Sequence, residues 1–556
     1  MSAGPTGRSA SVAGSGPGSG PGSGPGSGPL VRSAWLRLGL AALAGLAVTA
    51  GFAPYQQQVA LLAGLALLTV CLDGVSARSG GLVGLVFGVA FMATLMPWLQ
   101  VVGTDAWLGV AVLEGSFYAA YGAGHALLRR WPGWPVWAAC WWVAVEAARG
   151  RAPLGGFPWG RLAFSVPDGP FSAWPRWVGV PATSGLVLLT GCLLGAAALW
   201  ALRRRTPVRA AAVPAIAALG LVAVSPLLPT GLAEPDGSVS VALVQGGVPG
   251  TGAEGAAQQQ AVVGNHVQAT RDYAAAVAAG QAAAADVVIW PENGTDIDPF
   301  VHPTVGADIQ GAVDAVGVPT LIGAIVEGPA PGQAQNTGIV WQPGTGPGER
   351  YVKRHLVPFG EYIPFRSQLA PYISRLDQIP RDMVPGDEAG VLRLGPILVG
   401  DLLCFDVAYD DAVRDLSAAV TDGGAQLLVV QTNNATYLGT GQPAQQWEIS
   451  RVAATLAGRD LVVASVNGIS GVASADGATL QQSRSGVQEV LTAQVRLASG
   501  VTWGVRAGGW LELVVSGLGL LAVVGAAARP REGRPEPAGD GAPTATPAPS
   551  PAAATA

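Results

Sequence analysis

Residues 351–361 read YVKRHLVPFGE, and this stretch carries Lys353, the only lysine of the chain. All other basic residues are arginines. A lysine ammonium differs from a guanidinium because it is a compact point charge that can lose its proton. Lys353 is therefore a candidate for a position where arginine would fail, either as an oxyanion-stabilising ammonium or as a charge that lowers a thiol pKa. The alternative is an Arg-biased composition that leaves one lysine at a chance position.

Two other segments place a reactive side chain at the end of an apolar run. Residues 287–293 (VVIWPEN) lead to Glu292, and residues 397–406 (ILVGDLLCFD) lead to Cys404. Active sites in α/β sheets usually lie at strand ends, because the strand fixes the side chain while the loop opens space. Glu292 is a candidate general base, and Cys404 is a candidate nucleophile. The alternatives are a solvated loop glutamate and a buried inert cysteine.

A cysteine nucleophile needs a base, and three histidines leave a Cys–His arrangement open: His266, His302 and His355. None of them follows an apolar run as clearly as Glu292 does. The His and Cys residues also lack the spacing of metal ligands, so we expect no metal site.

The composition indicates a membrane protein. Half of the 556 residues are hydrophobic and only 12% are charged, against about 25% in an ordinary soluble domain. The net charge of −5 with no long basic run excludes a nucleic-acid partner. Apolar stretches of near-spanning length lie at residues 34–53, 58–72, 80–102, 106–128, 134–148, 177–202, 208–229 and 510–528. We therefore expect seven transmembrane helices, a large polar domain and an eighth transmembrane helix.

Arginine placement orients these spans. Arginines near one set of span ends are Arg32, Arg37, Arg78, Arg129, Arg130, Arg203, Arg204, Arg205, Arg209, Arg529, Arg531 and Arg534. By the positive-inside rule both termini are cytoplasmic and the large domain is extracytoplasmic. The connection 149–176 would be external despite its four arginines, and its GGFPW motif at residues 155–159 predicts a segment at the membrane surface. Glu114, in the middle of the fourth span, is a functional candidate, with helix packing as the alternative.

Short β-rich runs alternate with Ala-rich helical stretches between residues 233 and 508, which predicts a layered α/β domain. The expected strands are 239–244, 286–290, 320–326, 338–341, 397–404, 427–432 and 461–466, and the expected helices are 258–279, 411–420 and 446–457. The predicted domain map is a disordered Gly/Ser/Pro arm (1–33), seven helices (34–232), the α/β domain (233–508), an eighth helix (509–528) and a disordered Pro/Ala tail (529–556).

Together, the three segments resemble the carbon-nitrogen hydrolase (nitrilase) superfamily, whose members use a Glu, a Lys and a Cys in that chain order. Over roughly residues 34–528 the chain is similar to the apolipoprotein N-acyltransferases, in which a nitrilase-like domain is held between seven membrane helices and an eighth. The LVPFGE motif combined with eight spans is specific to this family, whereas WPE alone is not. The resemblance implies a multi-span helical membrane domain plus an αββα sandwich.

The resemblance also implies roles for single residues. Glu292 matches the general base, Lys353 the triad lysine and Cys404 the nucleophile. Glu361, eight residues after Lys353, matches a second essential carboxylate. The GGFPW motif and the segment Thr432, Asn433 and Asn434 also fit the family.

The implied activity is transfer of an acyl chain from a membrane phospholipid, through a Cys404 thioester, to the α-amino group of the N-terminal diacylglyceryl-cysteine of apolipoproteins. This reaction belongs to lipoprotein maturation at the cell membrane. The implied partners are the phospholipid donor, the apolipoprotein acceptor and membrane lipids. No metal or organic cofactor is required.

Two departures from the family pattern leave other functions open. Phe405 and Asp406 follow the nucleophile, where the family commonly has an aromatic residue and then the longer Glu. A tryptophan expected after the first strand has no counterpart in residues 245–260. The alternatives are an inactive paralogue, a membrane-anchored nitrilase-type amidase that passes the acyl group to water, and a transporter or scaffold whose spans are the working part.

Overall fold

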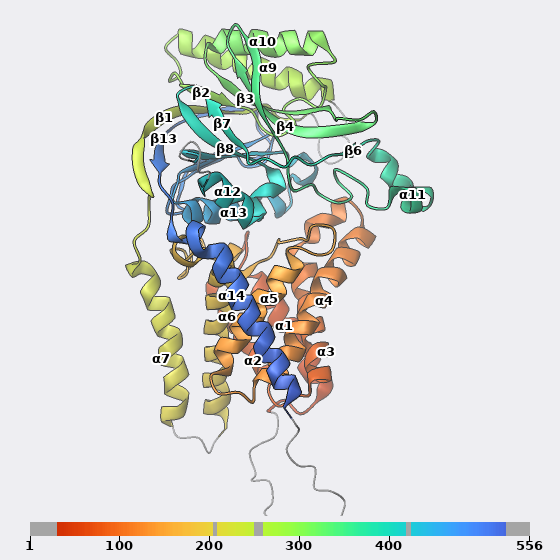
Figure 1. Ribbon diagram of the computed structural model, residues 1–556, viewed down its shortest axis with the longest axis vertical. Coiled ribbons are helices and arrows are strands. Elements are labelled where there is room, and N and C mark those ends of the chain that lie inside the picture. The colour runs from red at the N-terminus through yellow and green to blue at the C-terminus, as the bar shows by residue number, and fades with distance from the viewer. Residues whose placement is uncertain (1–29, 204–207, 249–258, 419–423, 530–556) are drawn as a thin grey trace, which may run out of the picture.

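The computed structural model describes residues 30–203, 208–248, 259–418 and 424–529. Along its longest axis it is layered, with helices at one end, then two β-sheets, then further helices and finally a bundle of long helices (Figure 1). Almost all of the predicted arm and tail lie outside the described residues. So does 249–258, most of the segment in which the family tryptophan has no counterpart.

The N-terminal part of the chain forms the helix bundle. Its helices are α1 (Ala34–Thr49), α2 (Gln58–Cys71), α3 (Ala77–Leu95), α4 (Thr104–Leu128), α5 (Trp134–Arg149), α6 (Pro175–Leu202) and α7 (Val208–Val224). The last helix, α14 (Trp503–Ala528), returns to this bundle and packs against α5 and α6 (Figure 1). Every predicted apolar stretch is thus a helix. α3 ends earlier than predicted because Pro97 starts the 3₁₀ helix η1 (Pro97–Val101), and α14 begins before residue 510.

Three of these helices, α3, α6 and α14, are long and apolar enough to cross a membrane by length and composition. Shorter apolar helices occupy Ala34–Thr49, Gln58–Cys71 and Ala212–Leu227. α14 exposes large apolar side chains such as Trp510, Leu513 and Leu521 along its length. Exposed apolar surface of this kind indicates contact with lipid or with another apolar partner.

The first sheet has the strand order β13-β1-β2-β3-β4-β5, with β6 paired to β4. Its central strands β1, β2 and β3 are parallel, and the flanking pairs are antiparallel, apart from the short parallel pairing of β6 with β4. The strands are β1 (Glu234–Gln245), β2 (Val287–Ile289), β3 (Thr320–Glu327), β4 (Gln333–Gln342), β5 (Gly346–Val352), β6 (Asp382–Met383) and β13 (Glu489–Ser499).

The second sheet has the order β12-β11-β10-β9-β8-β7, in which β8, β9 and β10 are parallel. Its strands are β7 (Val391–Leu394), β8 (Ile397–Leu403), β9 (Leu427–Thr432), β10 (Leu461–Ser465), β11 (Gly471–Ala473) and β12 (Thr479–Gln482). The predicted strand 397–404 ends one residue early, because Cys404 opens the 3₁₀ helix η6 (Cys404–Ala408).

Alternation of side chains along β1 explains the layering. Val241 and Leu243 face the second sheet and form one core with residues of β8 and β9, whereas Ala242 and Val244 face the helices α9 (Gln259–Ala278) and α10 (Pro303–Val316). This is the two-residue period of a strand that is buried on both faces. The outer face of the second sheet is covered by α12 (Asp410–Ala418) and α13 (Gln442–Ala457). The predicted α/β sandwich is confirmed.

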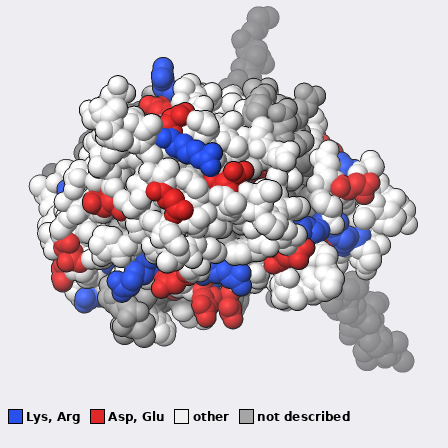
Figure 2. Space-filling view, turned by 90° about the horizontal axis from the view of Figure 1, so that it is seen from above, with Lys and Arg blue, Asp and Glu red and all other residues white. Residues whose placement is uncertain are grey.

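Acidic and basic side chains are interspersed on the face of the molecule that Figure 2 shows from above.

Several elements were not predicted, including α10, β5, β7 and β13.

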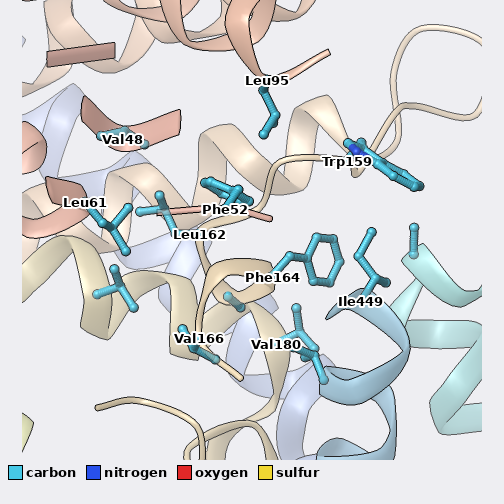
Figure 3. Packing of buried hydrophobic residues seen from close by; sticks show 14 of the residues in the cluster. Val48, Phe52, Leu61, Leu95, Trp159, Leu162, Phe164, Val166, Val180 and Ile449 are labelled. Atoms are coloured by element: carbon cyan, nitrogen blue, oxygen red, sulfur yellow. The ribbon is translucent and has the colours of Figure 1, made fainter. Parts of the chain in front are cut away.

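The sandwich and the helix bundle share one hydrophobic core. Val48 of α1, Phe164 of the connection between α5 and α6, and Ile449 of α13 belong to the same buried cluster (Figure 3). Gln445 of α13 adds polar links, because its side-chain oxygen accepts hydrogen bonds from the indoles of Trp98 and Trp159 at 3.1 and 2.7 Å. The two halves therefore form one packed body.

A buried ion pair holds the connection between α5 and α6 against the bundle. Arg149 at the end of α5 donates to the Glu114 carboxylate of α4 at 3.1 Å and to the carbonyl oxygens of Phe157 and Trp159, each at 2.7 Å. Both charged side chains are almost fully buried. Glu114 thus has a packing role, the alternative considered for it from the sequence.

We predict that Glu114→Ala destabilises the protein by about 3–5 kcal/mol, because it leaves the Arg149 charge buried without a partner. Thermal unfolding in detergent measures this loss. Asp105→Ala is the control, since it breaks an exposed ion pair with Arg375 and should leave the unfolding temperature unchanged. Equal unfolding temperatures for Glu114→Ala and Asp105→Ala would contradict the role assigned to the buried pair.

Candidate active site

The three predicted residues lie just beyond the ends of three strands. Glu292 follows β2, Lys353 follows β5 directly, and Cys404 follows β8 directly. Although 61 residues separate Glu292 from Lys353 in the chain, their side chains are in contact. The structure therefore brings these groups together at one site, as we expected from their positions at strand ends.

Lys353 is the centre of a buried charged cluster. Its Nζ donates to Glu292 Oε1 at 3.0 Å and to Glu361 Oε1 at 2.9 Å. The Nδ2 of Asn336, on β4, donates to the same two oxygens at 2.8 and 2.9 Å. Two carboxylates thus share one ammonium and one amide in a largely buried site.

Backbone amides fix the remaining oxygen of each carboxylate. The amide of Asn433 donates to Glu292 Oε2 at 3.0 Å, and the amide of Val357 donates to Glu361 Oε2 at 2.8 Å. Asn433 comes directly after β9, and Val357 lies within the LVPFGE motif. Both carboxylates are therefore held rigidly from two sides, which is the preorganisation that catalytic groups need.

The cluster shifts the protonation of its members. Burial alone would lower the pKa of the Lys353 ammonium, but the charges of Glu292 and Glu361 hold that pKa well above its usual value. Burial raises the pKa of Glu292, although the charge of Lys353 opposes the rise. The lysine consequently stays charged, and the glutamate is a stronger base than a solvated carboxylate.

Cys404 stands at a sharp turn between β8 and η6. Its φ of 51° lies in the left-handed region, which costs a non-glycine residue about 1–2 kcal/mol and is typical of strained functional sites. The Thr432 hydroxyl donates to its Sγ at 3.3 Å, and the Gln446 side-chain amide does so at 3.6 Å. The strand-end segment from Thr432 to Asn434 therefore belongs to this site, as expected.

The thiol is neutral in the free protein. Burial, together with the charge of Glu292 and against the charge of Lys353, raises the pKa of Cys404 to about 12. A neutral thiol next to a carboxylate of raised basicity is the arrangement of a nucleophile that is activated by proton transfer during the reaction.

Asp406 ties the nucleophile turn to the lysine segment. Its Oδ2 accepts from the Tyr351 hydroxyl at 2.8 Å and from the Leu403 amide at 3.3 Å, and its Oδ1 accepts from the His355 amide at 3.0 Å. Burial opposes ionisation, but the His355 hydrogen bond and the Lys353 charge hold the pKa of Asp406 below its usual value. The shorter Asp is thus fully bonded at the position where the family commonly has Glu.

Phe405 joins the nucleophile turn to the helix bundle. Its ring stacks on Phe157 and Trp159, with centroid separations of 5.5 and 6.1 Å, and packs edge-on against Tyr409 at 5.3 Å. Phe157 and Trp159 belong to the GGFPW motif, and Arg149 holds their carbonyl groups. The connection between α5 and α6 therefore forms an aromatic surface directly beside the candidate nucleophile.

The histidines occupy other positions. His355 contacts Asp406 at 3.1 Å, and His266 packs on Trp290 while its Nδ1 contacts the Val262 carbonyl. His302 is the residue that precedes α10. Neither these histidines nor Glu292 hydrogen-bonds to Cys404 in the described part of the chain, but Glu292 lies close enough for its charge to raise the pKa of the thiol, which favours Glu292 as the base. Within that same part, no three His, Cys, Asp or Glu side chains converge as metal ligands do.

Asn336 and Gln446 were not predicted, although both touch the cluster or the thiol. Asn336 is buried, but it lies in the polar first half of β4, between Gln335 and Thr337, so no local pattern singles it out. Gln446 lies on α13, which is buried on all sides. The sequence of such a helix shows no separate polar face, so the place of Gln446 in the site could not be predicted from it.

Comparisons with known proteins match both halves of the chain. The family model described as apolipoprotein N-acyltransferase N-terminal domain matches residues 44–193, and the carbon-nitrogen hydrolase model matches residues 240–504. The apolipoprotein N-acyltransferase of Mycolicibacterium smegmatis is 37% identical over 505 residues, which cover 86% of this chain and 83% of that protein. The one from Photobacterium profundum is 27% identical and covers 85% of this chain and 92% of that protein.

A crystal structure of an amidase from Nesterenkonia sp. was also found, with a TM-score of 0.34 and 20% identity. The match covers 51% of this chain and 98% of the amidase chain.

We predict that alkylation of Cys404 by iodoacetamide accelerates about tenfold for each pH unit between about pH 6 and about pH 9, because only the thiolate reacts. Mass spectrometry of the modified peptide measures the rate. Cys404→Ala is the control and should remain unlabelled, since Cys71, Cys140 and Cys192 are buried. A rate that reaches a plateau within this pH range would show a thiolate already formed and would contradict the raised pKa.

Proposed function

The chain belongs to the apolipoprotein N-acyltransferase family of acyltransferases, and we propose that it moves an acyl chain from a membrane phospholipid to the α-amino group of the N-terminal diacylglyceryl-cysteine of apolipoproteins. The observation that carries the mechanism is the buried contact of Lys353 with Glu292 and Glu361 beside a free cysteine. These groups supply a base, a fixed positive charge and a nucleophile in one dry site.

In the first step, Glu292 takes the proton of the Cys404 thiol, and the sulfur attacks the ester carbonyl carbon of the phospholipid. Lys353 stabilises the negative oxygen of the tetrahedral intermediate, because its charge is fixed before the reaction begins. The bond from carbon to the glycerol oxygen then breaks, and Glu292 returns the proton to that oxygen. A lysophospholipid leaves, and the acyl chain stays on Cys404 as a thioester.

In the second step, the α-amino group of the acceptor attacks the thioester carbonyl carbon. Glu292 accepts a proton from the attacking nitrogen, and Lys353 again faces the negative oxygen. The carbon–sulfur bond breaks, an amide bond remains on the acceptor, and the proton goes to the sulfur. The free thiol is thereby regenerated, and no other reactant is consumed.

The supporting residues hold this geometry. Glu361 accepts a hydrogen bond from the Lys353 ammonium, and Asn336 donates to both Glu361 and Glu292. These bonds hold the ammonium and the Glu292 carboxylate in fixed positions. Asp406 holds the strained turn of Cys404 through the Leu403 amide. Phe405 continues the aromatic surface of Phe157 and Trp159.

This aromatic surface favours a lipid substrate over a small amide. It belongs to the connection between α5 and α6, residues 149–176, and it places the nucleophile against the helix bundle rather than toward solvent. Both proposed substrates are lipid-anchored and would approach through a side opening at the level of the bilayer. The 149–176 connection would form the floor of that opening.

We also propose that α1 to α7 and α14 are eight transmembrane helices in the cell membrane, with the domain boundaries predicted from the sequence. Arg129 and Arg203, at the ends of α4 and α6, both pair with Asp73, which follows α2. The ends of α2, α4 and α6 thus lie together at one end of the bundle. Two of these ends carry arginines, which the positive-inside rule associates with the cytoplasmic side. Both termini would be cytoplasmic and the α/β domain extracytoplasmic.

We predict that the purified protein, incubated with alkyne-labelled phospholipid, acquires a label that hydroxylamine removes, because hydroxylamine cleaves thioesters. In-gel fluorescence after click chemistry measures it. Cys404→Ala should take no label. If wild type takes no label, or if Cys404→Ala labels equally, the acyltransferase mechanism fails.

Lys353→Arg provides the matched variant, since it keeps the charge but replaces the compact ammonium by a planar fork. We expect its labelling rate to fall about 10²–10³-fold, the range that follows loss of one oxyanion-stabilising donor. Addition of a diacylglyceryl-cysteine peptide separates the alternatives. Transfer of the label to the peptide supports the proposed acceptor, whereas release of free fatty acid alone would indicate the amidase-type reaction with water.

A further inference from the structure

Asp401 is a buried carboxyl group that the proposed mechanism does not use. It lies on β8, three residues before Cys404, and is 1% exposed. Among the described residues neither of its carboxyl oxygens has a hydrogen-bond partner, and both oxygens are buried. An ionised carboxylate is acceptor-only, so leaving it unpaired in this position is very unfavourable.

Gln431, on the neighbouring strand β9, carries a third oxygen without a partner in the described part of the chain, its Oε1. The two unpaired groups lie side by side. The position that a Cβ atom on Gly338 would occupy is 1.8 Å from Asp401 Oδ2 and 2.8 Å from Gln431 Oε1. Gly338 belongs to β4, so both oxygens point across the interface between the two sheets.

The orientation of the Gln431 amide is determined by its other end. Its Nε2 donates to the Trp290 carbonyl oxygen at 2.6 Å, and that carbonyl is only an acceptor. A flipped amide would set two acceptors against each other at this distance. Gln431 Oε1 must therefore face Asp401, and two acceptor oxygens face each other unless one of them carries a proton.

We propose that Asp401 is a neutral carboxylic acid that donates its proton to Gln431 Oε1 and, through the Gln431 amide, fixes the Trp290 carbonyl two residues before Glu292. Asp401 and Gln431 are then positioning residues for the general base, and this part of the inference rests on the proposed role of Glu292. One proton pairs Asp401 Oδ2 with Gln431 Oε1 and completes a chain from β8 through β9 to the end of β2.

The surroundings favour the neutral form. Burial raises the pKa of Asp401 well above its usual value, and the charges of Asp406 and Glu292 raise it further. The hydroxyl of Tyr351, a titratable group near Asp401, has a pKa that is raised by burial, by the charge of Asp406 and by the hydrogen bond to Asp406. Asp406 therefore stays ionised, because it accepts several hydrogen bonds, whereas Asp401 accepts none in the described structure and is neutral.

Infrared difference spectroscopy at about pH 8 tests the protonation without any assay of activity. We expect wild type minus Asp401→Asn to show the C=O stretch of a buried carboxylic acid, and the same band to persist in a Cys404→Ala background. Asp296 does not interfere, because burial raises the pKa of its carboxyl only to about 7, and the subtraction removes groups common to both proteins. Absence of the band would overturn the proposal even if acyl transfer is normal.

Acylation kinetics test the positioning role. Asp401→Asn supplies an amide donor of the same shape and should keep the single-turnover labelling rate within about threefold of wild type. Asp401→Leu removes the donor and should slow labelling about tenfold or more without a matching change in KM, because misplacement of a catalytic group acts on the chemical step. An Asp401→Asn variant as slow as Asp401→Leu would show that a carboxyl group itself is needed and would overturn the inference.

A glycine pair keeps this test informative if Asp401→Leu fails to fold. Gly338→Ala drives a methyl group into the Asp401 carboxyl and should slow labelling, whereas Gly348→Ala has its nearest neighbour, the Val340 carbonyl oxygen, at 3.6 Å and should not. Equal rates for the two variants would contradict the proposed contact. If wild type shows the carboxylic-acid band but takes no lipid label, the proposed function fails while the assignment of the proton stands.

Discussion

The structure depends on one buried positive charge. The Lys353 ammonium lies between the carboxylates of Glu292 and Glu361, and removing it would leave both carboxylates without their counter-charge in a largely buried site, at a cost of about 3–5 kcal/mol. The three residues come from the loops after β2 and β5 and from the LVPFGE motif. The contacts of this charge cluster therefore also constrain how the strands of the first sheet meet.

Direct contacts between neighbouring residues connect this charge cluster to Cys404 and to the helix bundle. Tyr351 and His355, which flank Lys353, both bond to Asp406 in the nucleophile turn. The neighbouring Phe405 stacks on the GGFPW motif, whose carbonyl groups are held by Arg149. A catalytic domain that acts on lipid-anchored substrates needs such a fixed relation between nucleophile and membrane helices, because neither substrate can diffuse freely to the site.

Much of this arrangement could be predicted from the sequence, because its signals are local. An apolar run that ends in Glu292 or Cys404 and a unique lysine at 353 are visible in a window of ten residues, and the apolar helices are visible in windows of twenty. β5 was missed because it is an edge strand with exposed Gly, Pro and charged residues. Asn336 and Gln431 act across strands that are far apart in the chain, so their partners could not be known before the sheets were in place.

Lys353 allows the central claim to be tested directly, because it is the only lysine of the chain and therefore the only side-chain ammonium group. Protein labelled with ¹⁵N at lysine Nζ gives one ammonium NMR signal, whose chemical shift reports protonation as the pH is raised. We expect Lys353 to stay protonated well above the ordinary lysine pKa of about 10.4, and Glu292→Gln to lower its titration point. A wild-type signal that titrates at or below the ordinary value would contradict the buried charge cluster on which the mechanism rests.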